Sequence, residues 1–192
     1  MEAAVTHPDV AWKSVYCCRV YHGYRLLNGE RNPAFRQATD GRLLNFKEGD
    51  LAAIDAEADE LGAVLNCLRL PLRVLVAVIP GHRAVVTNRG TPLAQLVDVL
   101  AVMDSRLVAS VDTLVRHRDV EKLSVGGSRS IKVHVESMRL QQPPPLRGET
   151  VVVLDDVMST GHSMQAAREL LGRAGAARVA CVAIGQTAKL MG

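Results

Sequence analysis

The sequence predicts an α/β fold, with one mostly parallel, twisted sheet covered by helices on both faces to give three layers. Its 192 residues suit a single domain with a sizeable core. Hydrophobic residues make up 48% of the chain but aromatic residues only 3%. Small and branched aliphatic side chains must therefore fill the core, as is usual for parallel sheets covered by helices. Strand and helix patterns alternate through the second half, which favours right-handed parallel connections.

Residues 1–49 are predicted to form an N-terminal segment distinct from a core of residues 50–192. Residues 14–21 mix β-branched, aromatic and Cys residues and predict a strand. Residues 22–49 are rich in Gly, Asn, Arg and Asp, so we expect a loop or a short hairpin. Asp50 then resembles a helix N-cap, because apolar residues follow it at helical spacing until Pro71.

The core elements follow from apolar runs and from turn residues. The strand of residues 73–79 is a nearly continuous apolar run that ends at Pro80. Thr91 as cap and Pro92 at the first helical position predict the start of a helix. The other expected elements are strands within residues 107–114 and at 133–140, 149–154 and 179–184, a helix at 163–174, a charged loop at 116–132 and a stiff connector at 141–148.

Composition bounds the kind of protein. The formal net charge of +3 is not concentrated in a basic stripe, so nucleic acid is not indicated as a partner, although it is not excluded. No Cys pair has zinc-ribbon spacing, and Cys67 and Cys181 are expected to be buried thiols of a reducing compartment. No signal peptide is evident and no apolar run approaches the roughly 20 residues that span a bilayer. A cytoplasmic protein without membrane contact is expected.

Residues 151–163, VVVLDDVMSTGHS, carry the chemistry. Four apolar residues predict a central strand, and Asp155 and Asp156 follow at its carboxyl end, where open α/β sheets bind ligands. Small hydroxyl residues and Gly161 then precede a helix, so free backbone N–H groups and the helix dipole can hold a phosphate. Carboxylates accept hydrogen bonds from vicinal hydroxyls, so the segment matches a 5-phosphoribosyl group.

An ordinary solvated turn would explain each piece of this segment separately, with Ser159 or Thr160 capping the helix. The complete and uninterrupted order of the pieces favours the ribose-phosphate site.

This order resembles the signature of the type I phosphoribosyltransferases, with His162 at the variable position. The resemblance implies the family's three-layer fold with a small N-terminal hood, here residues 1–49. It also implies phosphoribosyl pyrophosphate (PRPP) as substrate, used with Mg²⁺ that is held through the substrate, with Asp155 or Asp156 as a conceivable direct ligand. Asp155 and Asp156 would be the catalytic and ribose-contacting residues. The implied ribose 5-phosphate contacts are Asp155, Asp156, Ser159, Thr160, Gly161, His162 and Ser163.

The resemblance also implies a loop for the pyrophosphate and a mobile cover. Gly81, His82 and Arg83 follow an earlier strand and would bind the pyrophosphate, since Arg recognises phosphate through paired donors. An ordinary polar turn is the alternative. Residues 116–132 contain a Gly-Gly pair and positive charges that suit a closing loop, or else a solvated surface loop. The candidate residues of this flexible loop are Arg116, Arg118, Lys122 and Arg129.

The competence-associated branch of the superfamily is loosely the nearest. Its Arg-Gly segment is similar to Arg89–Gly90, and residues 114–118 with Arg129 are also similar. The zinc ribbon common in that branch is missing here. The resemblance covers roughly residues 70–187. Residues of the hood that could stack on or hydrogen-bond a base are Tyr21, Tyr24, Arg25, Asn28, Arg31 and Phe35.

The expected function is therefore a phosphoribosyltransferase in which a nitrogen nucleophile, from a base or an amine, displaces pyrophosphate from Mg-PRPP. A non-catalytic sensor or regulatory subunit that binds PRPP or a nucleotide is the alternative, since it needs the same contacts. A mere scaffold would have no need of the acidic pair and the Ser-Thr-Gly segment. The expected partner is a small phosphoribosyl ligand, and a homodimer stays open.

Overall fold

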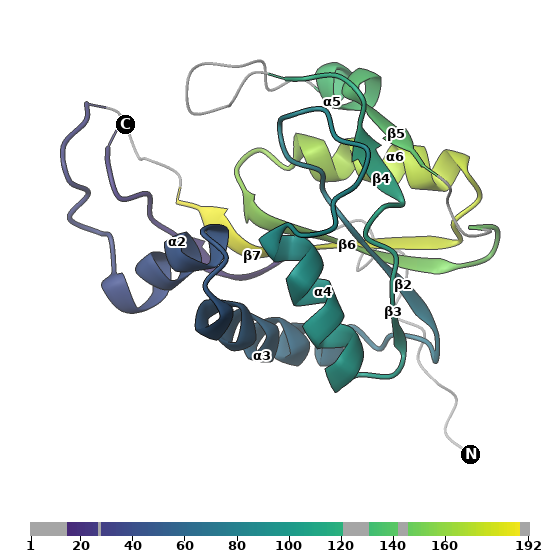
Figure 1. Cartoon of the computed structure of the whole chain (residues 1–192), viewed down its shortest axis with the longest axis horizontal. Helices are drawn as coiled ribbons and strands as arrows, with labels where there is room; N and C mark the ends of the chain where they lie inside the picture. Colours follow the sequence, from purple (N-terminus) through teal and green to yellow (C-terminus); the bar gives the residue numbers. More distant parts are fainter. Residues whose placement is uncertain (1–14, 27, 121–130, 142–145, 189–192) are drawn as a thin grey trace.

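A five-stranded sheet forms the centre of the computed structural model, which describes residues 15–26, 28–120, 131–141 and 146–188 (Figure 1). The strand order is β1–β7–β6–β2–β3, and each neighbouring pair is parallel. The strands are β1 (Val15–Tyr21), β2 (Val74–Val78), β3 (Leu107–Ala109), β6 (Thr150–Met158) and β7 (Arg178–Thr187). The parallel sheet predicted from the apolar runs is confirmed, and β6 lies at its middle.

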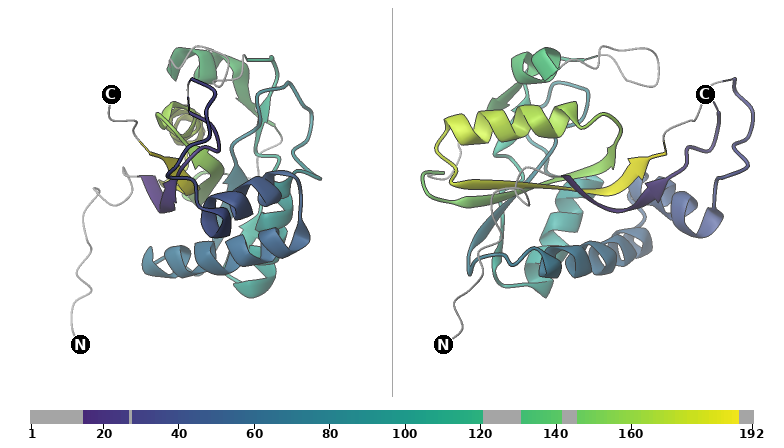
Figure 2. Two further views of the ribbon diagram at one scale, coloured as in Figure 1. Left: turned by 90° about the vertical axis from the view of Figure 1, so that its left-hand side faces the viewer. Right: turned by 180° about the vertical axis from the view of Figure 1, so that it is seen from behind.

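Helices cover both faces of this sheet (Figures 1 and 2). One face carries the π-helical turn η1 (Gln37–Gly41) with α2 (Arg42–Lys47), α3 (Leu51–Cys67) and α4 (Pro92–Met103). The other face carries α5 (Ile131–Ser137), α6 (His162–Arg173) and a small antiparallel pair, β4 (Leu114–Arg116) with β5 (Met138–Leu140). The chain therefore has the predicted three-layer α/β architecture.

Side chains of β6 alternate between two hydrophobic clusters. Val152 and Leu154 pack with buried residues of α3 and α4, whereas Val151 and Val153 pack with buried residues of α6. Because successive side chains of a strand point to opposite faces, an apolar run covered on both sides becomes the middle of the domain. The loop that follows β6 is thereby anchored in a strand whose first five residues are buried.

The predicted helix starts are confirmed at two positions. The side chain of Asp50 accepts a hydrogen bond of 2.8 Å from the backbone N–H of Ala53 and caps α3. Thr91 accepts from the backbone N–H of Ala94 at 3.2 Å, and Pro92 occupies the first turn of α4.

Two segments differ from their predicted structure. Residues 22–49 were expected to be a loop or hairpin, but they contain η1 and α2, which bury Leu43 and Phe46 in the core. Residues 133–140 were expected to be a strand, but most of them belong to α5, and only β5 is extended. The alternating Val residues of this segment suggested a strand, whereas helical spacing brings His134 and Ser137 together on a buried side.

The four cysteines are free thiols. Cys181 is buried as predicted, but Cys67 is exposed at the end of α3, contrary to the prediction. Within the described ranges, no helix combines the length and the apolar character that a membrane span requires.

Candidate ribose-phosphate site

The acidic pair lies at the carboxyl end of β6, as predicted. The strand continues through both residues, since Asp155 pairs with Ala183 of β7 and Val157 with Gly185. The alternation of β6 therefore directs the two carboxylates to different sides of the sheet edge. Each carboxylate accepts a backbone N–H: Asp155 Oδ1 from Asp156 at 2.9 Å and Asp156 Oδ1 from Val157 at 2.5 Å.

The electrostatic surroundings of the two carboxylates differ. Burial, and next the negative charge of Asp156, raise the pKa of Asp155 well above its usual value. Asp156 forms an ion pair with Lys47 of α2, whose Nζ lies 3.1 Å from Asp156 Oδ2. The carboxyl-terminal part of the central strand thus holds one carboxyl group with a raised proton affinity and one that is paired with a cation.

The phosphate cradle follows directly after β6. Ser159 and Thr160 are exposed, and Gly161 is the N-cap of α6 with a left-handed φ of +76°. A side chain at Gly161 would be strained there, and its Cβ would lie only 3.3 Å from Met158 Sδ. The tight turn presents the first backbone N–H groups of α6, including those of His162 and Ser163, at the positive end of the helix dipole. The predicted cradle therefore has the expected local geometry.

One residue outside the motif, His134, borders this cradle. His134 of α5 is buried, and its Nδ1 lies 3.4 Å from Ser163 Oγ. Burial, followed by the positive charge of Arg116, lowers the pKa of His134. A neutral imidazole therefore supports the start of α6. His134 falls within the strand that the sequence predicted at residues 133–140, and its helical spacing to Ser137 was the signal that could have placed it here.

The expected pyrophosphate loop, Gly81, His82 and Arg83, follows β2 on the neighbouring strand. The backbone N–H of Val120 donates to the carbonyl of His82 at 2.9 Å, and the N–H of Ala84 donates to Asp119 Oδ1 at 2.6 Å. These bonds attach both sides of the loop to the segment that follows β4. Gly81 and Arg83 are exposed and His82 is partly buried.

Arg116 does not belong to a flexible loop, contrary to the prediction. It lies in β4 with only 2% of its surface exposed. Its guanidinium donates to the carbonyl of Gly81 at 2.5 Å, to the carbonyl of Pro80 at 3.4 Å and to the hydroxyl of Ser137. Burial lowers the pKa of Arg116, and the charge of Asp155 opposes this. The side chain of Arg116 thus connects β4 to the expected pyrophosphate loop.

The other candidates for the flexible loop divide into two groups. Arg118 is exposed and donates to the backbone carbonyl of Glu136 at 3.3 Å. Lys122 and Arg129 lie outside the described residues, so their role stays a prediction.

One pocket joins the acidic pair to the pyrophosphate loop. Its volume is about 480 Å³, and α2 contributes two of its walls through Phe46 and Lys47. Neither residue could be predicted for the site, because nothing in the polar segment around α2 indicates that this helix reaches the sheet edge. The lining residues are Phe46, Lys47, Ile79, Pro80, Gly81, His82, Asn88, Thr91, Pro92, Leu93, Asp155 and Asp156.

The expected base-contacting residues of the hood do not line this pocket. Tyr24 and Phe35 pack edge to face with ring centroids 5.1 Å apart, and Arg25 and Arg31 each lie 5.9 Å from the Tyr24 ring centroid. They form a small aromatic and basic group of their own.

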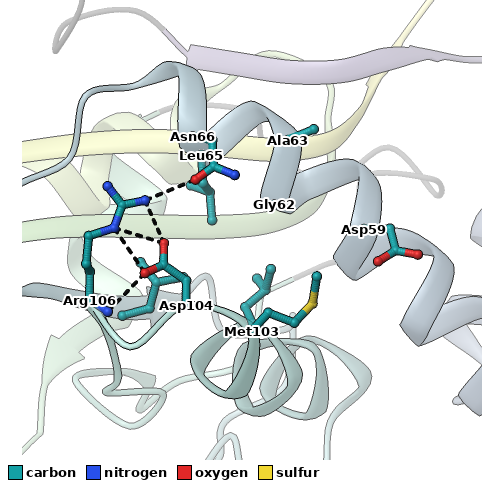
Figure 3. A pocket seen from close by; sticks show the side chains of 10 residues that line it. Asp59, Gly62, Ala63, Leu65, Asn66, Met103, Asp104 and Arg106 are labelled. Carbon is teal, nitrogen blue, oxygen red and sulfur yellow. Dashed lines mark hydrogen bonds and ion pairs between the residues drawn. The ribbon is translucent and has the colours of Figure 1, made fainter.

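A second cavity of about 480 Å³ lies between α3 and the end of α4 (Figure 3). Arg106 is held there by Asp104 at 2.7 Å and by Asn66 at 3.0 Å. No residue of the ribose-phosphate segment lines this cavity. Its cation, Arg106, is already paired with Asp104. Thr160 and Gly161 of the cradle line a third pocket of about 790 Å³, which is distinct from the pocket of the acidic pair.

The parallel sheet, with an acidic pair at the end of its middle strand and a helix N-terminus after it, defines a three-layer α/β protein whose candidate ligand site lies at the carboxyl end of the strands. Residues 87–188 match the model of the phosphoribosyl transferase domain, and the chain belongs to this family. The matched residues contain the acidic pair and the cradle but begin after Gly81, His82 and Arg83. The predicted family is therefore confirmed.

Curated relatives include two adenine phosphoribosyltransferases. The enzyme of Mycobacterium avium (strain 104) is 35% identical over 107 residues, which is 50% of this chain and 59% of that protein. The enzyme of Rhodospirillum rubrum is 35% identical over 109 residues, which is 51% of this chain and 64% of that protein. The chain thus matches about three fifths of the length of these relatives.

Solved structures with a similar arrangement share little sequence. A purine phosphoribosyltransferase from Pyrococcus horikoshii is 17% identical, with a TM-score of 0.43 over 70% of this chain and 82% of that chain. A hypoxanthine phosphoribosyltransferase from Staphylococcus aureus is 15% identical, with a TM-score of 0.40 over 71% and 68% of the two chains.

Proposed function

We propose that this protein is a phosphoribosyltransferase that uses Mg-PRPP and transfers the phosphoribosyl group to a nitrogen nucleophile. The observation that carries the proposal is the acidic pair in the carboxyl-terminal part of β6, followed directly by the cradle at the start of α6. The family membership supports the same activity. The adenine phosphoribosyltransferases among the relatives make a purine base the first acceptor to test.

In the proposed reaction, the carboxylates of Asp155 and Asp156 accept hydrogen bonds from the ribose hydroxyls. The cradle around Gly161 donates backbone N–H groups to the 5-phosphate, and the side chains of Ser159, Thr160 and Ser163 can add donors. His82 and Arg83 donate to the pyrophosphate. The bond from the anomeric carbon to the pyrophosphate oxygen breaks, a bond to the acceptor nitrogen forms, and the nitrogen loses a proton.

The donor atoms of the site fit Mg²⁺ only together with a substrate. Among the residues that the structure describes, no cluster of three or more Asp, Glu, His or Cys side chains could hold a metal ion. The oxygens of Asp155 and Asp156 are of the type that Mg²⁺ prefers, and the ion commonly keeps waters and substrate phosphates as its other ligands. When bound with PRPP, Mg²⁺ would neutralise charge on the leaving pyrophosphate.

Pyrophosphate release from Mg-PRPP, measured with a panel of purines, pyrimidines and small amines, tests this proposal. We expect release with at least one nitrogen acceptor. Tight binding of PRPP without release for any acceptor would instead support the sensor. Calorimetry with the double variant Asp155→Asn/Asp156→Asn should show a loss of PRPP affinity, and an unchanged affinity would refute the ribose assignment.

The remaining expectations stay predictions. They are a closing loop that includes Lys122 and Arg129, an N-terminal hood, a homodimer and a cytoplasmic location.

A further inference from the structure

The helix α2 places a basic side chain against the acidic pair. Lys47 Nζ lies 3.1 Å from Asp156 Oδ2, and Lys47 lines the same pocket as the two carboxylates. We propose that Lys47 is a positioning residue of the ribose subsite, which holds the Asp156 carboxylate in place to accept the hydroxyls of a ribose. This inference rests on the proposed function, since it concerns the same site.

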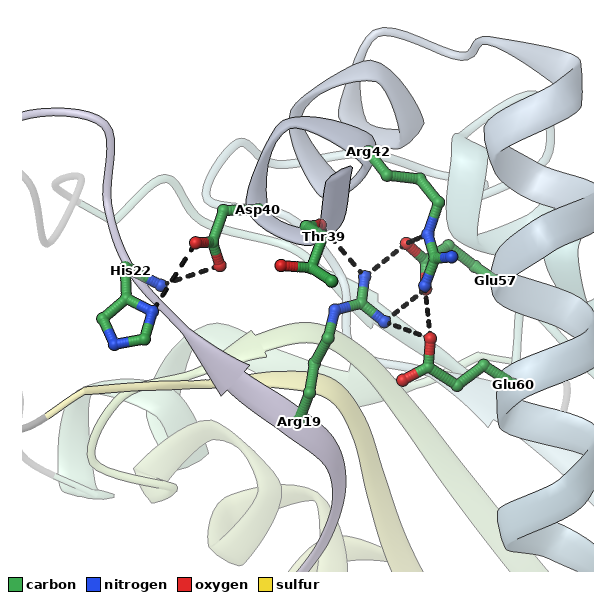
Figure 4. A network of polar contacts seen from close by, with 7 residues as sticks. All are labelled: Arg19, His22, Thr39, Asp40, Arg42, Glu57 and Glu60. Carbon is green, nitrogen blue, oxygen red and sulfur yellow. Dashed lines mark hydrogen bonds and ion pairs between the residues drawn. The ribbon is translucent and has the colours of Figure 1, made fainter. Parts of the chain in front are cut away.

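The position of α2 is fixed by packing and by charge. Leu43 and Phe46 are fully buried in the core beneath the helix. On its other side, Arg42 Nε donates to the buried carboxylate of Glu57 at 3.0 Å, and Arg42 also pairs with Glu60 of α3 (Figure 4). Lys47, at the last residue of the helix, is therefore carried by an anchored element.

The strand β1 completes this anchor. Arg19 donates to Glu57 at 2.9 Å and to Glu60 at 2.7 Å, so two arginines share the same two carboxylates (Figure 4). Asp40, which is buried in η1, accepts the backbone N–H of His22 at 3.0 Å and that of Arg36 at 2.8 Å. The turn that leads into α2 is thereby closed, and the ammonium of Lys47 stands at the negative end of the helix dipole.

The contacts of Asp156 leave room for a ligand. Its Oδ1 accepts the N–H of Val157 and its Oδ2 accepts the ammonium of Lys47, whereas a carboxylate offers about four acceptor positions. The side chains of Lys47 and Asp156 are 38% and 30% exposed, so the pair is open to the pocket. A ribose diol can therefore bind to the free positions while the ammonium keeps the carboxylate in place.

Several charged or titratable groups surround the acidic pair, and the experiment must separate Lys47 from them. Burial raises the pKa values of Asp155 and Tyr21, and the positive charge of Lys47 opposes both rises. Each neighbouring element contributes at least one such group. They are Cys17 and Tyr21 of β1, Lys47 of α2, His82 after β2, Arg116 of β4, and Cys181 of β7.

The test compares Lys47→Met with Lys47→Arg, and uses Arg73→Met as the control. Arg73 pairs with Glu149 at the opposite end of the sheet, so its loss changes the net charge by the same amount away from the site. The first measurement is the titration of the Asp carboxyl carbons by NMR without ligand. Because the charge of Lys47 opposes the rise in the pKa of Asp155, we expect Lys47→Met to raise that pKa further and Lys47→Arg to restore it.

The second measurement is calorimetry with Mg-PRPP from pH 5 to pH 8. Near pH 5, we expect Lys47→Met to weaken the binding of Mg-PRPP about tenfold for each unit by which the carboxyl pKa rises. The loss should be smaller at pH 8, where the carboxyl groups are more fully ionised. Lys47→Arg should recover most of the affinity, and Arg73→Met should resemble the unaltered protein. Lys47→Gln serves the same purpose if the Met variant does not fold.

Three results would overturn the inference. They are identical carboxyl titrations for Lys47→Met and the unaltered protein, a Lys47→Arg variant as impaired as Lys47→Met, or a tighter binding of PRPP after removal of the ammonium. The experiments distinguish a failure of the proposed function from a failure of the role assigned to Lys47. If the unaltered protein does not bind PRPP, the proposed function is wrong, while the carboxyl titration without ligand still decides the role of Lys47.

Discussion

Asp155 is a residue whose protonation depends on the fold rather than on its own chemistry. An exposed Asp titrates near pH 3.9, about the value expected in the unfolded chain. In the folded protein, burial and the charge of Asp156 raise its pKa well above that value. Between the two values the folded state binds more protons than the unfolded state, so stability falls as the pH rises through this range.

Replacing Asp155 with Asn should therefore stabilise the protein at neutral pH. We expect the free energy of unfolding to rise by about 1.4 kcal/mol for each unit of the pKa shift that is removed, and the gain to disappear below about pH 4. Urea unfolding between pH 3.5 and pH 8 measures this. Asp104→Asn provides the opposite case, since the hydrogen bonds from Arg106 lower the pKa of Asp104. That variant should lose stability above the unfolded pKa, and a loss for Asp155→Asn as well would contradict the prediction.

A substitution at Gly161 tests whether the cradle depends on the left-handed backbone angle of this residue. Its φ of +76° and the 3.3 Å approach of Met158 Sδ leave a β-branched side chain strained, at about 1–2 kcal/mol for the backbone alone. Gly161→Val should lose that stability and also bind PRPP more weakly, because the phosphate loop must shift. Thermal unfolding and calorimetry measure both effects. Gly172→Ala, at the far end of the same helix with open space around it, should leave affinity intact. A folded Gly161→Val with full affinity would contradict the prediction.

The motif residues of the site could be predicted from the sequence because they are contiguous. Asp155, Asp156 and Gly161 lie within one short segment, so their local order already specifies a strand, a turn and a helix start. Lys47 and Arg116 could not be predicted in this way. Each reaches the site only through tertiary packing, and no spacing within the chain connects either residue to β6.

At the level of elements, α2 and α5 show where local patterns were insufficient. Residues 131–137 carry alternating β-branched side chains that favour a strand, but packing against α6 and the burial of His134 and Ser137 select a helix. Residues 42–47 stand in a polar, glycine-containing segment, and their helix is stabilised by the burial of Leu43 and Phe46. In both cases tertiary contacts outweigh the intrinsic preference.

The link between β4 and the pyrophosphate loop is a second property of elements. Arg116→Met would remove the donors to the carbonyls of Pro80 and Gly81. We expect a loss of about 1–3 kcal/mol in the free energy of unfolding, because the buried carbonyl of Pro80 and the buried hydroxyl of Ser137 lose this donor. We also expect faster amide exchange around His82 and weaker binding of PRPP. Arg118→Met, which changes an exposed arginine two residues later, is the matched control. Unchanged exchange at the loop in a folded Arg116→Met would show that Arg116 does not hold it.

For the whole molecule, the sequence indicated a parallel sheet but not its order. The alternation of strands and helices predicts parallel neighbours, whereas the position of β1 beside β7 depends on pairing between the two ends of the chain. The seven residues of β1 thereby form one edge strand of the sheet, and the middle strand of the same sheet carries the acidic pair. The N-terminal segment thus contributes both an edge strand and, through α2, part of the pocket.

Removal of residues 1–49 should therefore destabilise the core and not merely the site. The edge of β7 from Cys181 to Thr187 would lose its partner strand. The buried Glu57 would lose Arg19 and Arg42, and breaking a buried ion pair in this way typically costs about 3–5 kcal/mol. Domains are typically stable by only about 5–15 kcal/mol, so these losses are a large part of the total. We therefore expect residues 50–192 alone to be largely unfolded or aggregated.

Circular dichroism with heating, and amide exchange across β7, measure this loss. Leu43→Ala gives a graded comparison within the intact chain, because it removes one fully buried side chain beneath α2 and leaves β1 in place. That variant should lose about 2–5 kcal/mol and still unfold cooperatively. If residues 50–192 unfolded in one sharp transition close to that of the full chain, the N-terminal segment would be an attachment to an independent core. The sheet register and the shared carboxylates of Glu57 and Glu60 argue that it is part of the same cooperative unit.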